Sequence, residues 1–298
     1  MKYYLILCIA FFQFSGFAQE EKDHNYYWNG YEQYDAKIAV ANCYVRESPS
    51  INSQLLDSLQ MGKSIKVLNT TEKYLKIKGI NVPWVEIQYQ NAAGRISTGF
   101  LWKGFTAIGF QETKNYLYLT LIDRIQNERD SENYEVDNFT ISVKLLDKNN
   151  AVVGQKTMKK AIGESAFFTS KAIGSLGLKG LEDIFRISFS GEACGIPTLY
   201  YYLGWNGKDF IELPKKYDVS DAGVFYHSED FIFPKEKGGK PNLIIKQIEE
   251  GEYDQESEKD NSYILNITKR TETYKWDGEK AEFISKTAPK KSKEKMKF

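Results

Sequence analysis

The feature that most constrains this chain is a series of short apolar and polar alternations, broken about every ten residues by turn-forming residues. After residue 36 the chain is rich in Tyr, Phe, Val, Ile and Thr. Period-two alternation gives a segment one wet and one dry face, as in a half-buried β-strand. The clearest segments are SIKVL at 64–68, VEIQY at 85–89, YLYLTLI at 116–122, FTISVKLL at 139–146 and FRISFS at 185–190. Helical periodicity is weak, so we expect an all-β protein.

The N-terminus has the pattern of a secretory signal peptide. Lys2 is followed by the apolar run YLILCIAFF and then by SGFA at 15–18, before charged residues begin. This run is too short to cross a bilayer, and no later segment is apolar enough to do so. We therefore expect removal of residues 1–18 and export to the periplasm or the extracellular space, with no transmembrane segment. Cys8 lies inside the apolar run rather than at its end, which argues against a lipid anchor.

Charge and cysteine content narrow the possible functions. The chain has 40 basic and 40 acidic residues, so no net field attracts nucleic acid. Two cysteines, Cys43 and Cys194, follow the signal peptide, and disulfides persist outside the cytoplasm. They either form a disulfide between domains or stay as two buried thiols, and the sequence does not decide between these alternatives.

The length that remains after cleavage, about 280 residues, predicts two domains. The first carries strand and turn motifs in a fixed order, which are VRESPS at 45–50, Leu59, Gly62 and VL at 67–68, WVEIQY at 84–89, and Gly94 with GFL at 99–101. In this order they resemble the bacterial SH3-like domain, SH3b, over residues 37–108, and we place a domain boundary near residue 110. The chain departs from the family at Glu47, at Phe100 and in residues 74–83, which look like an enlarged loop.

The resemblance implies a small β-barrel that binds a ligand and does not catalyse a reaction. The ligands of such domains are commonly cell-wall peptides, peptidoglycan or partner proteins of the envelope. Aromatic and polar side chains near the variable loops suit stacking on peptides or glycans. The candidate ligand-binding residues are Tyr44, Arg46, Trp84, Tyr89, Phe100 and Trp102. Trp84 and Phe100 also fit a role in the barrel core.

Residues 111–285 predict a second, larger β domain. Trp205-Asn206-Gly207 and Trp276-Asp277-Gly278 each follow aromatic residues, and such pairs tolerate the positive φ angles of a two-residue type I′ hairpin turn. We therefore expect a β-sandwich or a β-meander with weakly propeller-like hairpins. Residues 19–36 are expected to be a linker, and the lysine-rich residues 286–298 a basic disordered tail.

A catalytic alternative uses Cys194 as nucleophile and His227 as base. A thiol near neutral pH needs an adjacent base to become a thiolate, and the protein would then be a cell-wall hydrolase of the cysteine peptidase type. Cys194 follows a strand and meets Gly195-Ile196-Pro197, which favours a loop rather than the start of a helix. A third alternative is a structural or assembly protein that makes only protein contacts.

The sequence predicts no cofactor and offers one weak metal site. The acidic run after residue 248 places carboxylates at alternate positions, where hard oxygen ligands could hold calcium. The candidate ligands are Asp254, Glu256, Glu258 and Asp260. The EF-hand order is absent, and such runs are usually solvated loops.

Overall fold

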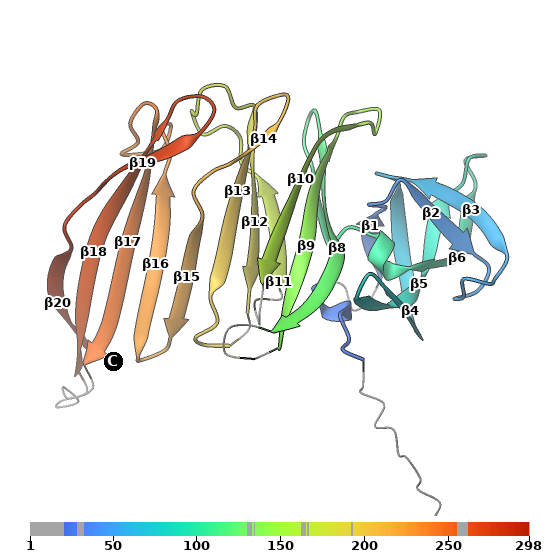
Figure 1. The fold of residues 1–298 in the computed structure, drawn as a ribbon, viewed down its shortest axis with the longest axis horizontal. Helices are drawn as coiled ribbons and strands as arrows, with labels where there is room; N and C mark the ends of the chain where they lie inside the picture. The colour runs from blue at the N-terminus through green and yellow to red at the C-terminus, as the bar shows by residue number, and fades with distance from the viewer. Residues whose placement is uncertain are drawn as a thin grey trace, which may run out of the picture.

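The computed structural model describes residues 21–28, 33–129, 133, 135–161, 165, 167–191, 193–254 and 262–297. These residues form β-strands and two short 3-10 helices, η1 (Asn25–Tyr27) and η2 (Lys103–Phe105). The expected all-β fold is confirmed (Figure 1). The predicted signal peptide, residues 1–18, lies outside the described residues. Within those that are described, no helix is long and apolar enough to cross a membrane.

The first part of the chain forms a curled six-stranded antiparallel sheet (right side of Figure 1). Its strands are β1 (Tyr34–Lys37), β2 (Asn42–Arg46), β3 (Leu55–Gln60), β4 (Ser64–Ile77), β5 (Ile80–Gln90) and β6 (Ile96–Trp102), in the order β1-β4-β5-β6-β2-β3. Alternating residues such as Val45, Val67 and Ile87 fill the inside of the curl. The predicted period-two segments 64–68 and 85–89 therefore lie in β4 and β5.

Residues 74–83 are not an enlarged loop, and that prediction is wrong. β4 and β5 continue as a hairpin arm that turns at Lys78 and Gly79, both with positive φ. The arm reaches the next sheet, where the backbone N–H of Ile125 donates to the Lys78 carbonyl at 3.1 Å. A Cβ on Gly79 would lie 1.9 Å from the Ile125 carbonyl oxygen, so only glycine permits this approach.

The second part of the chain begins as two four-stranded layers. One layer contains β7 (Gly109–Glu112), β8 (Leu117–Arg129), β9 (Glu135–Leu146) and β10 (Val152–Ala161), and the other contains β11 (Phe167–Ala172), β12 (Asp183–Ser190), β13 (Thr198–Trp205) and β14 (Phe210–Glu212). The inner faces meet in one apolar core, in which the Tyr118 and Phe185 rings stack with centroids 4.3 Å apart. We call this unit the sandwich.

The second layer then continues beyond the sandwich as an extended sheet (Figure 1). β14 and β15 pair with different ends of β13, so the sheet leaves the sandwich through β15. The added strands are β15 (Lys216–Asp221), β16 (Phe225–Ile232), β17 (Leu243–Asp254), β18 (Ser262–Trp276), β19 (Ala281–Lys286) and β20 (Lys290–Lys297). The predicted second domain, residues 111–285, thus contains both the sandwich and most of this extension.

The two predicted tryptophan hairpins form, but with longer loops than expected. β13 and β14 are joined by Asn206–Asp209, and β18 and β19 by Asp277–Lys280. In each loop the first residue accepts backbone N–H groups from the third and fourth through its side chain. These side-chain bonds close a four-residue loop, so a two-residue type I′ turn is not needed.

Two end segments differ from the sequence prediction. The supposed linker contains β1 and a buried pair, Tyr27 and Trp28, which pack in the core between the sheets. The supposed disordered tail forms β20, which pairs with β18 over residues 262–269. β19 pairs with only part of β18. The remaining backbone N–H and C=O groups of β18 pair with the lysine-rich segment and hold it as a strand, although this segment has no apolar core of its own.

Candidate functional site

Three of the six predicted ligand-binding residues are buried. Trp84 and Trp102 belong to the core that the six-stranded sheet shares with the sandwich, and Tyr89 belongs to the core inside the curl. Their burial leaves little side-chain surface for contact with a ligand, and Trp84 takes the core position that the sequence left open. The aromatic side chains that the sequence suggested for stacking instead bury apolar area between the two parts of the molecule.

Trp102 shows how firmly this contact is built. Its indole Nε1–H donates to the carbonyl oxygens of Leu75, at 2.8 Å, and Val82, at 3.2 Å. Both acceptors lie on the hairpin arm formed by β4 and β5. The Trp102 ring also packs edge-on against Phe105, with centroids 5.0 Å apart. The arm and this tryptophan thus fix the six-stranded sheet against the sandwich.

The other three predicted residues remain at the surface. The Tyr44 side chain is 50% exposed, and Arg46 and Phe100 are partly exposed and lie opposite each other on β2 and β6. The Arg46 guanidinium donates to the Ser53 carbonyl at 2.6 Å, which holds the turn between β2 and β3. This site is therefore smaller and less aromatic than the sequence predicted.

Further exposed apolar residues, absent from the sequence prediction, lie on β3 and in the turn before it, where Leu55 pairs with Arg46. Leu55 is 51% exposed, Leu56 is 45% exposed, and Ile51 in the adjacent turn is also exposed. We define the β2–β3 surface as Tyr44, Arg46, Ile51, Leu55 and Leu56. The sequence LLDSLQ could have predicted an exposed leucine here, because two successive leucines of a strand cannot both face the inside of the sheet. A register shift between Val45 and Arg46 leaves Leu56 outside the regular pairing.

β3 also offers a free backbone edge beside these side chains. It ends the sheet order, and no strand in the described part of the chain pairs with its outer side. Charged residues or prolines often protect such an edge from pairing. β3 carries one aspartate, Asp57, and no proline or lysine. The β2–β3 surface therefore combines exposed apolar side chains with unpaired main-chain groups.

The two residues of the catalytic alternative line one cavity. Cys194 and His227, with Asp218 and Ser220, border a cavity of about 450 Å³ beside β15 and β16. The Cys194 turn is tied to β15 because the Gly195 backbone N–H donates to the Ser220 carbonyl at 2.8 Å. Cys194 and His227, which are 33 positions apart in the sequence, therefore line the same cavity, as the catalytic alternative requires.

His227 is held by two carboxylates and an aromatic ring. Its Nδ1 lies 3.2 Å from a Glu250 oxygen, and its Nε2 lies 3.2 Å from a Glu229 oxygen without hydrogen-bond alignment. The Tyr217 ring stacks on the imidazole at 4.2 Å. Both ring nitrogens of His227 thus face carboxylate oxygens rather than the Cys194 thiol. This arrangement opposes a role for His227 as the base that activates Cys194.

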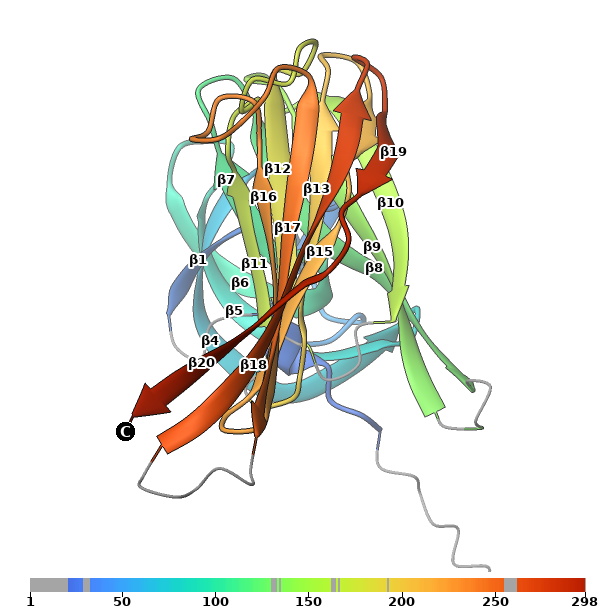
Figure 2. The same ribbon diagram turned by 90° about the vertical axis from the view of Figure 1, so that its left-hand side faces the viewer.

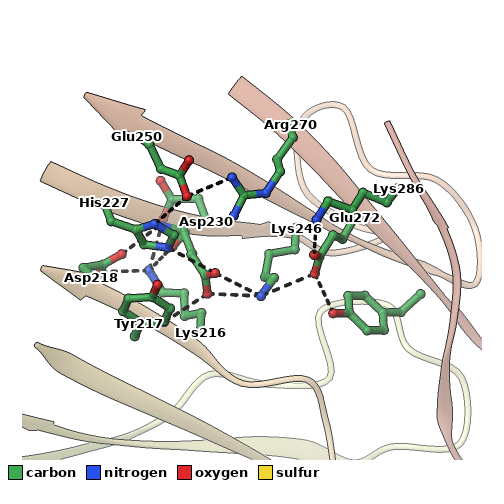
Figure 3. A network of polar contacts seen from close by, with 12 residues as sticks. Lys216, Tyr217, Asp218, His227, Asp230, Lys246, Glu250, Arg270, Glu272 and Lys286 are labelled. Carbon is green, nitrogen blue, oxygen red and sulfur yellow. Dashed lines mark hydrogen bonds and ion pairs between the residues drawn. The ribbon is translucent and has the colours of Figure 1, made fainter. Parts of the chain in front are cut away.

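His227 belongs to a wider polar network on the extended sheet (Figure 3). Lys246 lies 3.1 Å from Glu229 and 3.5 Å from Glu272. The Arg270 guanidinium lies 2.8 Å from Glu250. Partial burial acts to raise the pKa of Glu250, but the hydrogen bond and charge of Arg270, helped by His227, lower it.

A third cation of the network, Lys216, is also paired with carboxylates. Lys216 lies 3.2 Å from Asp218 and 3.3 Å from Asp230, and its ammonium sits 4.4 Å from the Tyr200 ring centroid. Opposite charges therefore pair within the network, as buried charges require. We interpret it as a structural cluster that joins β15, β16, β17 and β18.

The weak metal prediction receives no support. Asp254 ends β17, while Glu256, Glu258 and Asp260 lie outside the described residues. Over the ranges that the structure describes, no group of three or more His, Cys, Asp or Glu side chains could hold a metal ion.

The two cysteines are both free. Cys43 is buried inside the curled sheet, and burial raises the pKa of its thiol to about 12. Cys194 is exposed. The expectation of buried thiols is therefore confirmed for Cys43 and wrong for Cys194, and no disulfide joins them. Cys194 lies in a turn that is closed by a glycine with positive φ, which leaves the thiol in solvent.

The comparisons with protein-family models, with curated proteins and with solved structures returned no match.

Proposed function

We propose that this chain is a non-enzymatic, exported envelope protein that binds a peptide or a partner protein through the β2–β3 surface. The observation that carries the proposal is the exposure of Tyr44, Leu55 and Leu56 beside the free edge of β3. Exposed apolar side chains gathered on one surface favour association. A free strand edge offers backbone donors and acceptors to an extended peptide, which adds as a further strand.

The resemblance of residues 37–108 to SH3b domains supports a binding role for the same part of the chain. It makes a cell-wall peptide or an envelope protein the expected ligand. Stacking on the sugar rings of peptidoglycan has less support, because Trp84, Tyr89 and Trp102 are buried. The pattern of residues 1–18 supports export to the periplasm or the extracellular space.

A cysteine-dependent wall hydrolase is the second candidate. It is favoured by the cavity that Cys194 and His227 share and opposed by the carboxylates that hold His227. Loss of turbidity of a cell-wall suspension that disappears in Cys194→Ser would establish it. The third candidate, an assembly protein with protein contacts only, uses the same β2–β3 surface and differs in the partner.

Selection from a displayed library of random peptides tests the proposal. The wild-type mature chain should enrich peptides, and Tyr44→Ser/Leu55→Ser should lose them because both apolar contacts are removed. The matched control is Val152→Ser/Val224→Ser, which removes two exposed apolar side chains elsewhere and should keep binding. Equal binding by both double variants, or no enrichment by the wild type, would contradict the proposal.

Isolated cell wall provides the second arm of the same experiment. The wild-type chain should pellet with the wall if the ligand is a wall peptide, and the Tyr44→Ser/Leu55→Ser variant should stay in the supernatant. A chain that enriches peptides but stays in the supernatant with the wall binds a partner protein instead.

A further inference from the structure

The far edge of the extended sheet carries unneutralised positive charge. β19 and β20 both pair with the outer edge of β18, one after the other, and end the sheet opposite the curled sheet (Figure 1). Figure 2 looks onto this edge, with β18, β19 and β20 toward the viewer. β20 has the sequence KKSKEKMK, with one acid among its lysines. Lys290, Lys291 and Lys293 are exposed.

Lys290, Lys291 and Lys293 differ from the lysines of the polar network because, among the described residues, no acidic side chain forms an ion pair with them. The ion pairs near this edge join Lys269 to Glu249, Lys280 to Glu282 and Lys286 to Glu272. Glu250 and Glu252 of β17 line one cavity with Lys291 and Lys293. They lie two strands away, about 10 Å from β20, and Glu250 is held by Arg270.

The single acid of β20 faces away from two of these lysines. Side chains alternate along a strand, so Lys291 and Lys293 share one face, about 7 Å apart, and Glu294 lies on the other. Glu294 acts on Lys269, whose pKa is raised by the hydrogen bond and charge of Glu249 and, to a smaller extent, by Glu294. Glu294 therefore does not offset the charge of Lys291 and Lys293, and Glu252, on the same face, forms no ion pair with either lysine among the described residues.

Exposed apolar side chains stand on the same edge. Phe283 and Ile284 of β19 are 52% and 50% exposed, and a register shift at this point leaves Ile284 outside the regular pairing. An alternative explanation is that the lysines on this edge strand simply prevent its pairing with another sheet and bind no ligand. That role does not explain Phe283 and Ile284, because apolar side chains on an edge promote association rather than prevent it.

We propose that the β19–β20 edge docks onto an anionic lipid surface. Lysines attract acidic headgroups, and exposed aromatic and aliphatic side chains enter the boundary between headgroups and acyl chains. A soluble polyanion would satisfy the lysines but would offer nothing to Phe283 and Ile284. The edge lies at the opposite end of the molecule from the β2–β3 surface (Figure 1), so a bound membrane would leave that surface free. The inference does not depend on the proposed function.

Vesicle sedimentation of the mature chain tests this inference. The chain should pellet with phosphatidylcholine vesicles that contain phosphatidylglycerol, should stay in the supernatant with pure phosphatidylcholine, and should be released by salt. The variant Lys290→Glu/Lys291→Glu/Lys293→Glu should bind on the order of 100-fold more weakly, since each lysine contributes about a fivefold gain near such a surface. The control variant Lys66→Glu/Lys73→Glu/Lys208→Glu changes the net charge by the same amount at exposed positions elsewhere. Its affinity for the anionic vesicles should fall far less.

Two further measurements separate this inference from the alternatives. Phe283→Ser/Ile284→Ser should weaken binding to the anionic vesicles and leave binding to inorganic polyphosphate unchanged. Thermal unfolding midpoints should match among all variants, because the altered side chains are exposed. Equal losses for the two lysine variants, binding to polyphosphate but not to vesicles, or no binding to anionic vesicles would each overturn the proposal.

Discussion

Trp84 and Trp102 lie directly opposite each other on β5 and β6, and both side chains are buried in the core that the curled sheet shares with the sandwich. Their burial means that the part resembling an SH3b domain is not a free module on a linker. The N-terminal segment strengthens the same contact, because Tyr27 packs edge-on against Phe139 at 4.7 Å and the Trp28 Nε1–H donates to the Thr106 carbonyl.

Replacing Trp84 by Ala should therefore destabilise the whole molecule. Removal of a buried tryptophan costs about 3–5 kcal/mol through lost burial and the cavity that remains. Because the core is shared, denaturant unfolding should stay a single transition at a lower midpoint, followed by both fluorescence and far-UV circular dichroism. Two separate transitions, with only one shifted, would show that the curled sheet and the sandwich unfold independently.

Lys103 should be destabilising at neutral pH. Its side chain is buried, its Nζ donates to Asn25 Oδ1 at 2.6 Å, and burial lowers its pKa from 10.5 to about 8. The folded state therefore binds fewer protons than the unfolded state between these values, so stability rises with pH across that window. Lys103→Met should stabilise the chain by about 1–3 kcal/mol at pH 7, and its advantage should shrink from pH 8 to 10.5. An advantage that is constant with pH would contradict the assignment.

His24 should make the N-terminal segment sensitive to acid. Its Nδ1 accepts the Asn81 backbone N–H at 3.0 Å. Burial lowers its pKa below the usual 6.5, although Asp137 acts in the opposite direction. A ring protonated at Nδ1 cannot accept this hydrogen bond. The stability that the bond supplies is therefore fully present above pH 6.5 and is lost as the pH falls through the lower pKa of the folded state. His24→Gln, which keeps an acceptor without titrating, should flatten the loss of stability between pH 7 and 5. A slope that matches the wild type would exclude His24.

The two thiols should react very differently. Cys194 is exposed, whereas Cys43 is buried with a pKa of about 12. A maleimide added to the native mature chain should label Cys194 within minutes, and Cys43 should be labelled only after denaturation, because the thiolate is the reacting species. Peptide mapping identifies the labelled site. Native labelling of Cys43, or a disulfide-linked peptide that contains both cysteines, would be inconsistent with the structure.

The Glu229–Lys246 pair should be required for the extended sheet. Both side chains are buried, and the pair connects β16 to β17 at 3.1 Å. Glu229→Gln leaves the lysine without its main counter-charge and should cost about 3–5 kcal/mol. The double variant Glu229→Leu/Lys246→Met removes both charges and should recover much of that loss in chemical denaturation. No recovery in the double variant would mean that the cost comes from packing rather than from charge.

The sequence predicted local structure well where one strand carries its own signal. Alternation located β4, β5, β8, β9 and β12, and the Asn-Gly and Asp-Gly pairs located both tryptophan hairpins. The sequence cannot show which face of a strand another sheet covers, so it makes Trp102 a ligand candidate and leaves Trp84 between a ligand contact and the core. It also could not show that β18 leaves an edge open for Lys290–Lys297, because that pairing depends on main-chain groups and not on side-chain pattern.

Hydrogen exchange at the amides of Leu55–Gln60 tests the central claim most directly. A peptide selected by the wild-type chain and added in excess should slow exchange along β3, because its backbone pairs with the free outer edge of that strand. Amides of the buried strand β5 should be unchanged and serve as the internal reference. Bound peptide that leaves the exchange rates of Leu55–Gln60 unaltered would contradict binding at the β2–β3 surface.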